Sequence, residues 1–276
     1  MVRPTGLDKA SILPLFPLLS SHDPPTRLDA SVSLISSLPS IDLSGSTAPL
    51  SDDADTPYTI KRLVTGLGSS NQASRQGFAV ALAELVARLP DDQAATVLPL
   101  VMSSSTPTAG AESREERDLL FGRLLGLHAI VRSNVVFKDT PAAADGFKEV
   151  ILALLGLSGK KAWMREPAYW VLVQAVRTLL ELPAKAAPTW RDEQTAWIVQ
   201  RLLVDSREKA RGWGPDKIAL VLILQAFEVE ADYNAILAPT FPNGNPLARA
   251  SLIALSQALK VSISSCNHTL NFCADS

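Results

Sequence analysis

Apolar residues recur at helical spacing along most of the chain. In the first such stripe Phe78, Leu82, Leu85 and Leu89 fall at positions i, i+4, i+7 and i+11, which places them on one face of a helix with 3.6 residues per turn. The stripe lies inside the segment Ile60–Val101. We interpret this segment as a helix, a tight turn, a second long helix and a third helix.

The same spacing returns twice further along the chain. The second stripe comprises Leu120, Leu124, Leu127 and Val131. It belongs to a predicted helix over Arg114–Asn134, in which Gly122 and Gly126 are spaced to let a neighbouring helix approach closely. The third stripe comprises Tyr169, Val173, Val176 and Leu180. Three stripes of one period indicate helices that each need a partner for their apolar face.

Prolines, glycines and polar turn residues mark the ends of these helices. The turn Gly68–Asn71 supplies both a helix stop and an N-cap for the helix that follows. Pro167 is expected in the first turn of its helix, where a missing N–H costs nothing, and Pro183 ends that helix. Further helices are predicted over Leu7–Leu19, Arg27–Leu38 (with Leu28, Val32, Ile35 and Leu38 on one side), Phe147–Leu157, Asp192–Asp205, Pro215–Val229 (buried all round) and Pro246–Leu259.

The chain shows no convincing run of period-2 alternation, so we predict an all-α fold. Helices that cannot bury their apolar faces alone stack on neighbours, which favours an armadillo/HEAT-like helical-repeat solenoid. Because no fixed repeat period is visible, a compact helical bundle remains the alternative. We expect a weakly helical N-terminal segment and polar loop over 1–56, a helical-repeat domain over 57–260 with a flexible insert at 103–113, and an atypical, disordered tail over 261–276.

Composition narrows the class of protein. The 276 residues are 47% hydrophobic and 20% charged, which is enough for a sizeable core, and the net charge of −2 does not suit a protein that grips nucleic acid with its whole surface. Asp8 and Lys9 interrupt the early apolar stretch, so no secretory signal is expected. The run Ile218–Leu224 is far shorter than the ~20 residues of a membrane span. A soluble nuclear or cytosolic protein with no membrane contact is expected.

Basic residues on the predicted helices suggest a candidate interaction face. The face comprises Lys61, Arg62, Arg75, Arg123 and Arg132. Such a set could bind phosphates or an acidic partner. The alternative is an ordinary solvated helix surface. Arg123 lies off the apolar stripe of its helix, so the substitution Arg123→Glu is expected to leave folding intact while weakening an acidic partner.

Two groups of residues resemble metal ligands. The first is Cys266, His268 and Cys273, which offers three ligands where a structural zinc site needs four. The second is Asp52, Asp53 and Asp55, which lack the ordered spacing of a calcium loop and lie in a Pro/Ser-rich stretch. We predict no metal site at either place.

The sequence signals for catalysis and for cofactor binding are weaker than those for metal ligands. The segment Gly156–Lys161 has the wrong spacing for a Walker loop, and no Ser or Thr follows its lysine, so it is better interpreted as a helix C-cap. His128 has no visible paired nucleophile and is interpreted as a helix-packing or surface histidine. We therefore predict no catalytic residue, no cofactor and no small-molecule substrate.

Four blocks of sequence carry a family resemblance. They are IKRLVTGLGSSNQASRQGFAVALAELV from Ile60, RDLLFGRLLGLHAIVRS at Arg117–Ser133, WMREPAYWVLVQAVRTL at Trp163–Leu179 and GWGPDKIALVLILQ at Gly212–Gln225. In this order, over roughly Tyr58 to Leu259, the chain resembles the N-terminal part of the DNA polymerase phi family, also called the Pol5 or Myb-binding protein 1A family.

The resemblance implies a function that composition alone does not. It implies a nucleolar protein of ribosomal RNA gene transcription and ribosome biogenesis, built on an armadillo-like scaffold, that binds transcription or ribosome-assembly factors and ribosomal DNA. A family B polymerase would need paired metal-binding aspartates in a Tyr-x-Asp-Thr-Asp turn on a β-hairpin, and this chain has neither. We expect a non-enzymatic scaffold. The alternatives are a DNA-directed DNA polymerase and a generic cytoplasmic HEAT-type adaptor.

Overall fold

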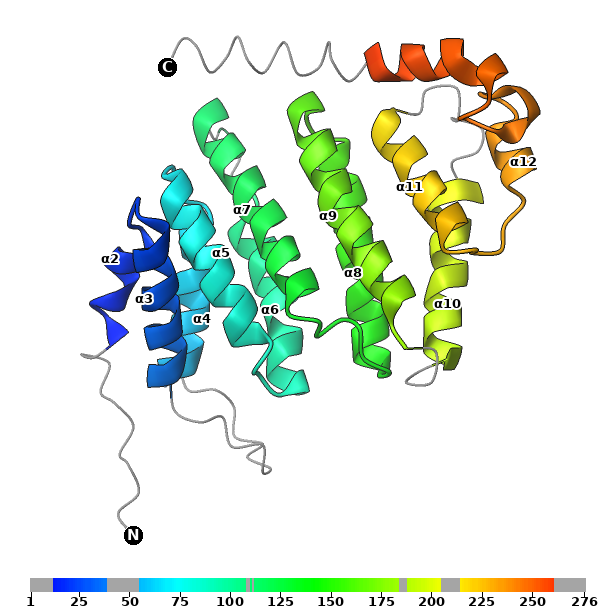
Figure 1. Ribbon diagram of the computed structural model, residues 1–276. Coiled ribbons are helices and arrows are strands. Elements are labelled where there is room, and N and C mark those ends of the chain that lie inside the picture. The colour runs from blue at the N-terminus through cyan, green and yellow to red at the C-terminus, as the bar shows by residue number, and fades with distance from the viewer. Residues whose placement is uncertain are drawn as a thin grey trace. The chain divides into compact units, whose positions relative to one another are not determined.

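The computed structural model describes residues 12–38, 55–107, 110, 112–183, 188–204 and 214–260, and every element within them is helical (Figure 1). The predicted all-α class is confirmed. The chain divides into two compact units, Met1–Val150 and Ile151–Ser276. None of the described helices combines the length and the apolarity needed to cross a lipid bilayer.

The first unit is built from helices that pack on their neighbours in two rows. Its helices are α2 (Leu15–Leu19), α3 (Pro24–Ser37), α4 (Asp55–Gly66), α5 (Gln72–Val86), α6 (Asp91–Ser104), α7 (Ser113–Arg132) and the first part of α8 (Pro141–Ser158). Helices α3, α5 and α7 pack side by side, and α4 packs against α6 behind them, with α4 and α6 also touching the front row (Figure 1). The core of the unit lies between these rows.

Two of the three predicted stripes form this core. The first stripe, Phe78, Leu82, Leu85 and Leu89, is buried. The second stripe, Leu120, Leu124, Leu127 and Val131, is buried as well. The periodicity of long helices therefore identified their inward faces correctly in this unit.

The inward face of α3 was predicted wrongly. Leu28 and Val32 are 57% and 59% exposed, whereas Ala30, Ser31 and Leu34 are buried. The helix begins at Pro24, with Asp23 as its N-cap accepting a hydrogen bond from the Thr26 backbone N–H (3.0 Å). Small residues on the buried side let α3 lie close to its neighbours, and a search for large apolar residues misses such a face.

Glycines fix how closely the helices approach in this unit. A Cβ at Gly122 of α7 would lie 3.1 Å from backbone atoms of Leu67 and Gly68, so the predicted close approach is confirmed and its partner is the turn that directly follows α4. At Gly77 of α5 the carbonyl oxygen of Leu19 occupies the place that a Cβ would take. Phe16 on α2 also stacks on Phe78, with ring centroids 6.4 Å apart.

The second unit is also helical throughout its described residues. It contains the second part of α8, α9 (Ala162–Glu181), α10 (Pro188–Ile198), a π-helical turn (Val199–Val204), α11 (Pro215–Ala226), α12 (Tyr233–Leu237), the 3₁₀ turns Pro242–Gly244 and Arg249–Ser251, and a helix over 252–260. Helix α9 packs against α10 and α11. The predicted helix over 192–205 is thus an α-helix that ends in a π-helical turn.

Three expectations for this unit are corrected. Pro167 lies inside α9 rather than in its first turn, because the helix begins at Ala162, and its ring nitrogen has no hydrogen to donate to the carbonyl four residues earlier. The buried face of α9 is centred on Ala168, Leu172, Ala175 and Leu179, one position from the predicted stripe. Helix α11 is not buried all round, since Leu222 and Ile223 are half-exposed.

Candidate functional site

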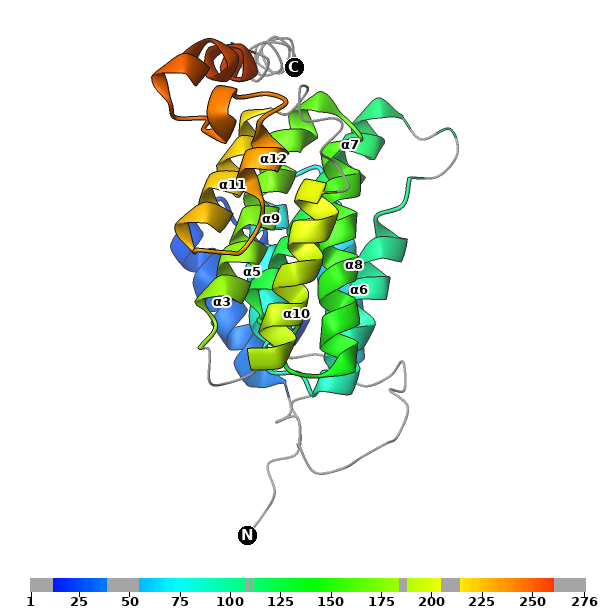
Figure 2. The same ribbon diagram turned by 90° about the vertical axis from the view of Figure 1, so that its right-hand side faces the viewer.

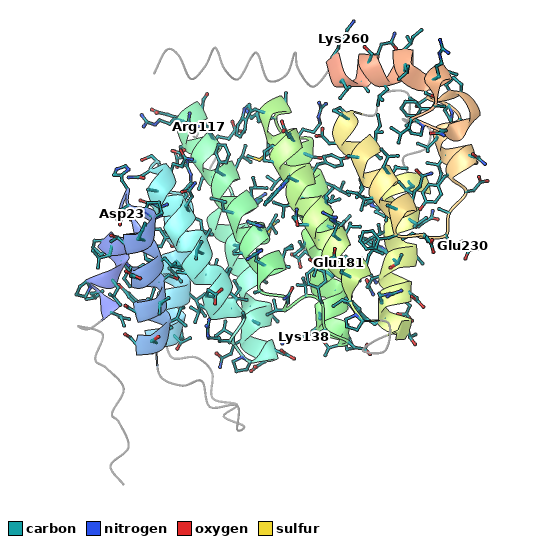
Figure 3. All side chains as sticks on the ribbon, viewed as in Figure 1. Asp23, Arg117, Lys138, Glu181, Glu230 and Lys260 are labelled. Carbon is teal, nitrogen blue, oxygen red and sulfur yellow. The ribbon has the colours of Figure 1, made fainter. Side chains whose placement is uncertain are left out.

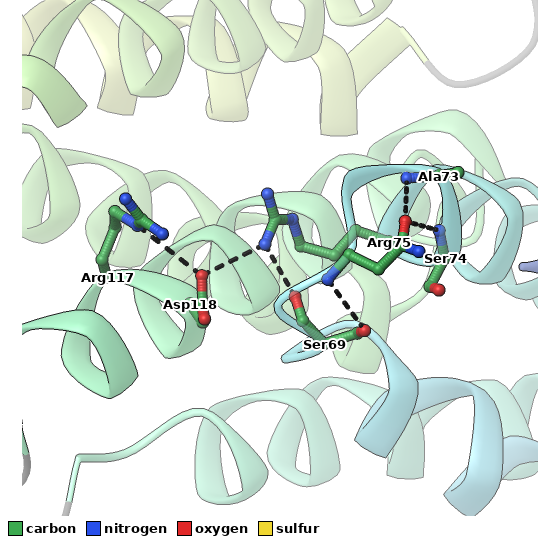
Figure 4. Close-up of polar contacts among 7 residues, drawn as sticks. Ser69, Ala73, Ser74, Arg75, Arg117 and Asp118 are labelled. Atoms are coloured by element: carbon green, nitrogen blue, oxygen red, sulfur yellow. Dashed lines mark hydrogen bonds and ion pairs between the residues drawn. The ribbon is translucent and has the colours of Figure 1, made fainter. Parts of the chain in front are cut away.

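Arg75, one of the predicted interaction residues, lies in a buried polar network at the start of α5. Its Nη1 donates a hydrogen bond to the Ser69 carbonyl oxygen (2.7 Å) and lies 3.2 Å from Oδ1 of Asp118 on α7 (Figure 4). The side chains of Arg75 and Asp118 are only 13% and 8% exposed. Arg117 approaches the same carboxylate with its Nε at 3.6 Å, and the Arg75 guanidinium lies over the Phe121 ring at 5.2 Å.

The local sequence explains why this arginine is held so firmly. Asn71 is the N-cap of α5, and its Oδ1 accepts hydrogen bonds from the backbone N–H groups of Ala73 (2.8 Å) and Ser74 (3.3 Å) (Figure 4). Its own backbone N–H donates to Ser69 Oγ (3.2 Å). The predicted cap is confirmed. Arg75 therefore connects the α4–α5 turn to α7, and its charge is used inside the unit.

The electrostatics of this network follow from burial. Burial lowers the pKa of the Arg75 guanidinium, and the neighbouring Asp118 carboxylate opposes that effect. A buried ion pair gains from hydrogen bonds that satisfy its remaining donors and acceptors, and here the Ser69 carbonyl supplies one of them. The network therefore stabilises the contact between the α4–α5 turn and α7, and it does not present Arg75 as an open binding surface.

Arg123, a second predicted interaction residue, also acts within the unit. Its Nη2 donates to the carbonyl oxygens of Met102 and Ser105 (both 3.1 Å), and its Nε donates to Ser105 Oγ (3.0 Å). These acceptors lie at the C-terminal end of α6, where carbonyl groups have no helical donor and carry partial negative charge. Burial lowers the pKa of Arg123. The expectation that Arg123→Glu leaves folding intact is therefore revised.

The other three predicted residues are exposed. Lys61 and Arg62 lie on α4, where the Arg62 guanidinium is 4.8 Å from the centre of the Phe16 ring and its Nη1 donates to the Tyr58 hydroxyl (3.4 Å). Arg132 is in the last turn of α7. It is nine positions beyond Arg123, which is about 13 Å along the helix and roughly half a turn around it. Arg123 and Arg132 therefore do not share a face of α7.

The second unit holds a comparable pair that the sequence did not reveal. Arg165 Nε on α9 lies 3.3 Å from Asp216 Oδ2 on α11, with the two side chains 27% and 14% exposed. Neither of these two atoms has a hydrogen-bond partner. Burial raises the pKa of Tyr169, Asp216 raises it further, and Arg165 opposes both effects.

The residues weighed for metal binding and catalysis give no cluster in the described part of the chain. No group of three or more His, Cys, Asp or Glu side chains there could hold a metal ion. Asp52, Asp53, Cys266, His268 and Cys273 lie outside the described residues, as does the side chain of Asp55. His128 is half-buried on α7, and burial together with nearby Arg132 lowers its pKa.

Comparison with known proteins agrees with the resemblance. The model of the family described as DNA polymerase phi matches residues 58–275. The chain belongs to the DNA polymerase phi family. It is 28% identical over 248 residues to the rDNA transcriptional regulator pol5 of Schizosaccharomyces pombe, and this match covers 90% of the chain but 24% of the relative.

Two further relatives extend the comparison. The rDNA transcriptional regulator POL5 of Saccharomyces cerevisiae is 26% identical over 272 residues, covering 89% of the chain and 25% of that protein. The Myb-binding protein 1A of Rattus norvegicus is 31% identical over 124 residues, covering 45% of the chain and 8% of that protein. The chain thus spans about a quarter of the length of the two regulators. No solved structure matches it.

The four blocks that carry the resemblance meet in the structure as two pairs. Arg75 lies in the first block and its partner Asp118 in the second. Arg165 lies in the third block and its partner Asp216 in the fourth. Sequence reasoning did not select Asp118, Arg165 or Asp216, because each block carries several charged residues and the spacing along one helix does not show which of them is buried against another.

Proposed function

We propose that this chain is part of a non-enzymatic nuclear, nucleolar scaffold that regulates ribosomal RNA gene transcription and ribosome biogenesis through protein contacts. The observation that carries the proposal is the match of nine-tenths of the chain to a protein named an rDNA transcriptional regulator. A second regulator with the same printed role matches over a similar share. Both relatives are named as regulators rather than as polymerases, which favours a scaffold.

The packing within the first unit supports a helical-repeat architecture of the armadillo/HEAT kind. Arg75 is near the start of α5 and Asp118 near the start of α7, so these two helices run in the same direction. Arg123 in the middle of α7 reaches the end of α6, and Lys138 beyond the end of α7 pairs with Asp91 at the start of α6, so α6 and α7 run in opposite directions. Alternating directions with parallel helices two apart are typical of stacked helical pairs.

We divide the candidate interaction face into two groups of residues with different proposed roles. Arg75 and Arg123 stabilise helix ends and turns, so their charges are directed at the unit itself. Lys61, Arg62 and Arg132 are exposed, and we assign the contacts with acidic proteins or with ribosomal DNA to these three. Exposed Lys and Arg contribute mainly long-range attraction, which weakens as ionic strength rises.

A segment exchange tests the proposed role. The matching segment of the fission yeast relative is replaced by this chain, and nascent ribosomal precursor RNA is measured in cells that express the chimaera. We expect synthesis close to that of the unmodified relative, while deletion of the segment lowers it. A chimaera that is expressed at the normal level but behaves like the deletion would contradict the proposal.

Two further measurements separate the alternatives. Affinity capture of the tagged chain from nuclear extract, with and without nuclease, should recover ribosomal RNA transcription or assembly factors in both cases. Recovery that is lost with nuclease would indicate that nucleic acid bridges the contact, and Lys61, Arg62 and Arg132 would then be substituted. Primer extension by the purified chain with magnesium would favour a polymerase, and fluorescence of a tagged chain confined to the cytoplasm would favour a generic adaptor.

A further inference from the structure

A groove lies in the first unit between α6 and the first half of α8, which are neighbours in Figure 2. Its volume is about 180 Å³. Leu98, Ile130 and Val136 line it with apolar side chains, and Asp91, Asp145 and Glu149 line it with carboxylates. Lys138 lies beyond the opposite end of α7 from Arg117 (Figure 3), so this groove is distant from the Arg75–Asp118 network.

Small residues on both helices keep the groove open. Ala95 on α6 and Ala142 and Gly146 on α8 line it, and both alanines are exposed. Pockets for small molecules usually measure about 300–1,000 Å³. A groove of about 180 Å³ is better matched to one or two apolar side chains that project from a larger partner.

The helices that line the groove indicate the secondary structure of a partner that can bind there. The lining residues of α6 extend from Asp91 to Pro99, about 12 Å or two helical turns. Both walls are helices, so they offer no sheet edge to which an extended peptide could add a strand. A partner that docks here must satisfy its own backbone hydrogen bonds, as an amphipathic helix does.

The charge of the partner follows from the carboxylates. Asp145 and Glu149 are exposed, and neither forms an ion pair with another residue in the described part of the chain. Asp91 is exposed too, but it is partly neutralised by an ion pair with Lys138. An apolar groove bordered by uncompensated negative charge is complementary to a helix with apolar residues on one face and Lys or Arg beside them.

We propose that this groove binds a basic amphipathic helix of a partner protein, with apolar side chains between α6 and α8 and Lys or Arg side chains beside Asp145 and Glu149. The inference names a class of partner for the protein-binding role proposed above and rests on that role. A peptide-binding experiment with the purified chain does not depend on ribosomal RNA synthesis, so the two proposals can fail separately.

The probe is a fluorescein-labelled peptide of about 18 residues, long enough to form a helix, with Leu and Lys at helical spacing. Fluorescence anisotropy measures its binding to the parent chain and to two variants. Ala95→Trp fills the groove from an exposed helix position, and Asp145→Lys with Glu149→Lys reverses the charge of its border. We expect each variant to weaken binding roughly tenfold or more.

A control variant reverses one charge elsewhere in the unit, which is half the change of charge in the double variant. Asp29 on α3 is exposed and does not line the groove, so Asp29→Lys should leave affinity within about twofold of the parent value. A second peptide with Glu in place of every Lys should bind roughly tenfold more weakly. Urea unfolding of each variant establishes that it is folded.

Several results would overturn the proposal. They are no binding of the Lys peptide to the parent chain, equal binding of the Lys and Glu peptides, and undiminished binding to folded Ala95→Trp. Sedimentation tests the remaining possible occupant of the groove, which is a second copy of this chain. A parent chain that is dimeric, becomes monomeric with Ala95→Trp and does not release its dimer when the Lys peptide is added would assign the groove to a second copy instead.

Discussion

Each unit contains an arginine–aspartate pair that joins two helices, and the two pairs are alike in position but differ in burial and hydrogen bonding. In both cases the arginine is the fourth residue of its helix, and its partner lies near the start of the helix two further along the chain. Arg75 and Asp118 are 13% and 8% exposed, and Arg165 and Asp216 are 27% and 14% exposed. The first pair is thus the more deeply buried.

The difference lies in the hydrogen bonds around each pair. Arg75 Nη1 bonds both Asp118 and the Ser69 carbonyl. By contrast, the closest atoms of the second pair, Arg165 Nε and Asp216 Oδ2, form no hydrogen bond. Burial of charge is compensated only where the remaining donors and acceptors are satisfied. We infer that the first pair fixes its unit more strongly than the second pair does.

The largest effect is expected from Asp118→Ala. It leaves the Arg75 guanidinium buried without its anion, which should lower the free energy of unfolding of the first unit by about 3 kcal/mol. Hydrogen exchange of amides in α5 and α7 measures this directly. The five tryptophans all lie beyond residue 150, so their fluorescence follows the second unit separately. Unchanged exchange in α5 and α7 would contradict the assigned role of Asp118.

A smaller loss is expected from Arg123→Glu. Like Arg75, Arg123 donates to backbone carbonyls, and a carboxylate near the C-terminal end of α6 would replace attraction by repulsion. We expect a loss of about 1–2 kcal/mol in the first unit, after allowance for partial exposure of the side chain. Lys61→Glu, at an exposed position in the middle of α4, is the control with the same change of charge. Equal stability of the two variants would remove the structural role of Arg123.

The substitution Asp216→Ala should cost less than Asp118→Ala. Because the second pair is more exposed and less well hydrogen-bonded, we expect a loss of about 1 kcal/mol, measured by tryptophan fluorescence during urea unfolding. The same variant should lower the pKa of Tyr169, since Asp216 helps to raise it, and an alkaline absorbance titration would detect that change. The relative loss of unfolding free energy in Asp118→Ala and Asp216→Ala tests which pair stabilises its unit more. A greater loss from Asp216→Ala would contradict the inference that the first pair is the stronger.

The smallest effect concerns pH. Burial and Arg132 lower the pKa of His128 in the folded chain below its ordinary value of 6.5, so the unfolded chain binds more protons near that pH. Stability is therefore retained above pH 6.5 and decreases as the pH falls through 6.5 toward the folded pKa. His128→Gln should reduce the change in the urea midpoint between pH 7.5 and 5.5 relative to the parent chain. An identical dependence on pH in the variant and the parent chain would exclude this role of His128.

The sequence predicted the helices better than it predicted what their charges do. Long stripes such as Phe78–Leu89 identified inward faces because large apolar side chains and helical period coincide there. The face of α3 was missed because it buries Ala30 and Ser31, which carry little hydrophobic signal. Arg75 and Arg123 were interpreted as surface residues, because a pattern along one helix does not contain the carbonyls and carboxylates of other segments that bind them.

The contact between α2 and α5 bears on how the protein can be shortened. The family model begins at residue 58, yet the Leu19 carbonyl fills the space beside Gly77, and Phe16 covers Phe78. A polypeptide trimmed to the region that the family model matches would lose both of these covering residues. It would expose the backbone at Gly77 and the ring of Phe78 to solvent, and exposed apolar surface promotes aggregation. The start of the family-model match therefore lies inside the folded unit, and we expect a stable protein to require a start before Phe16.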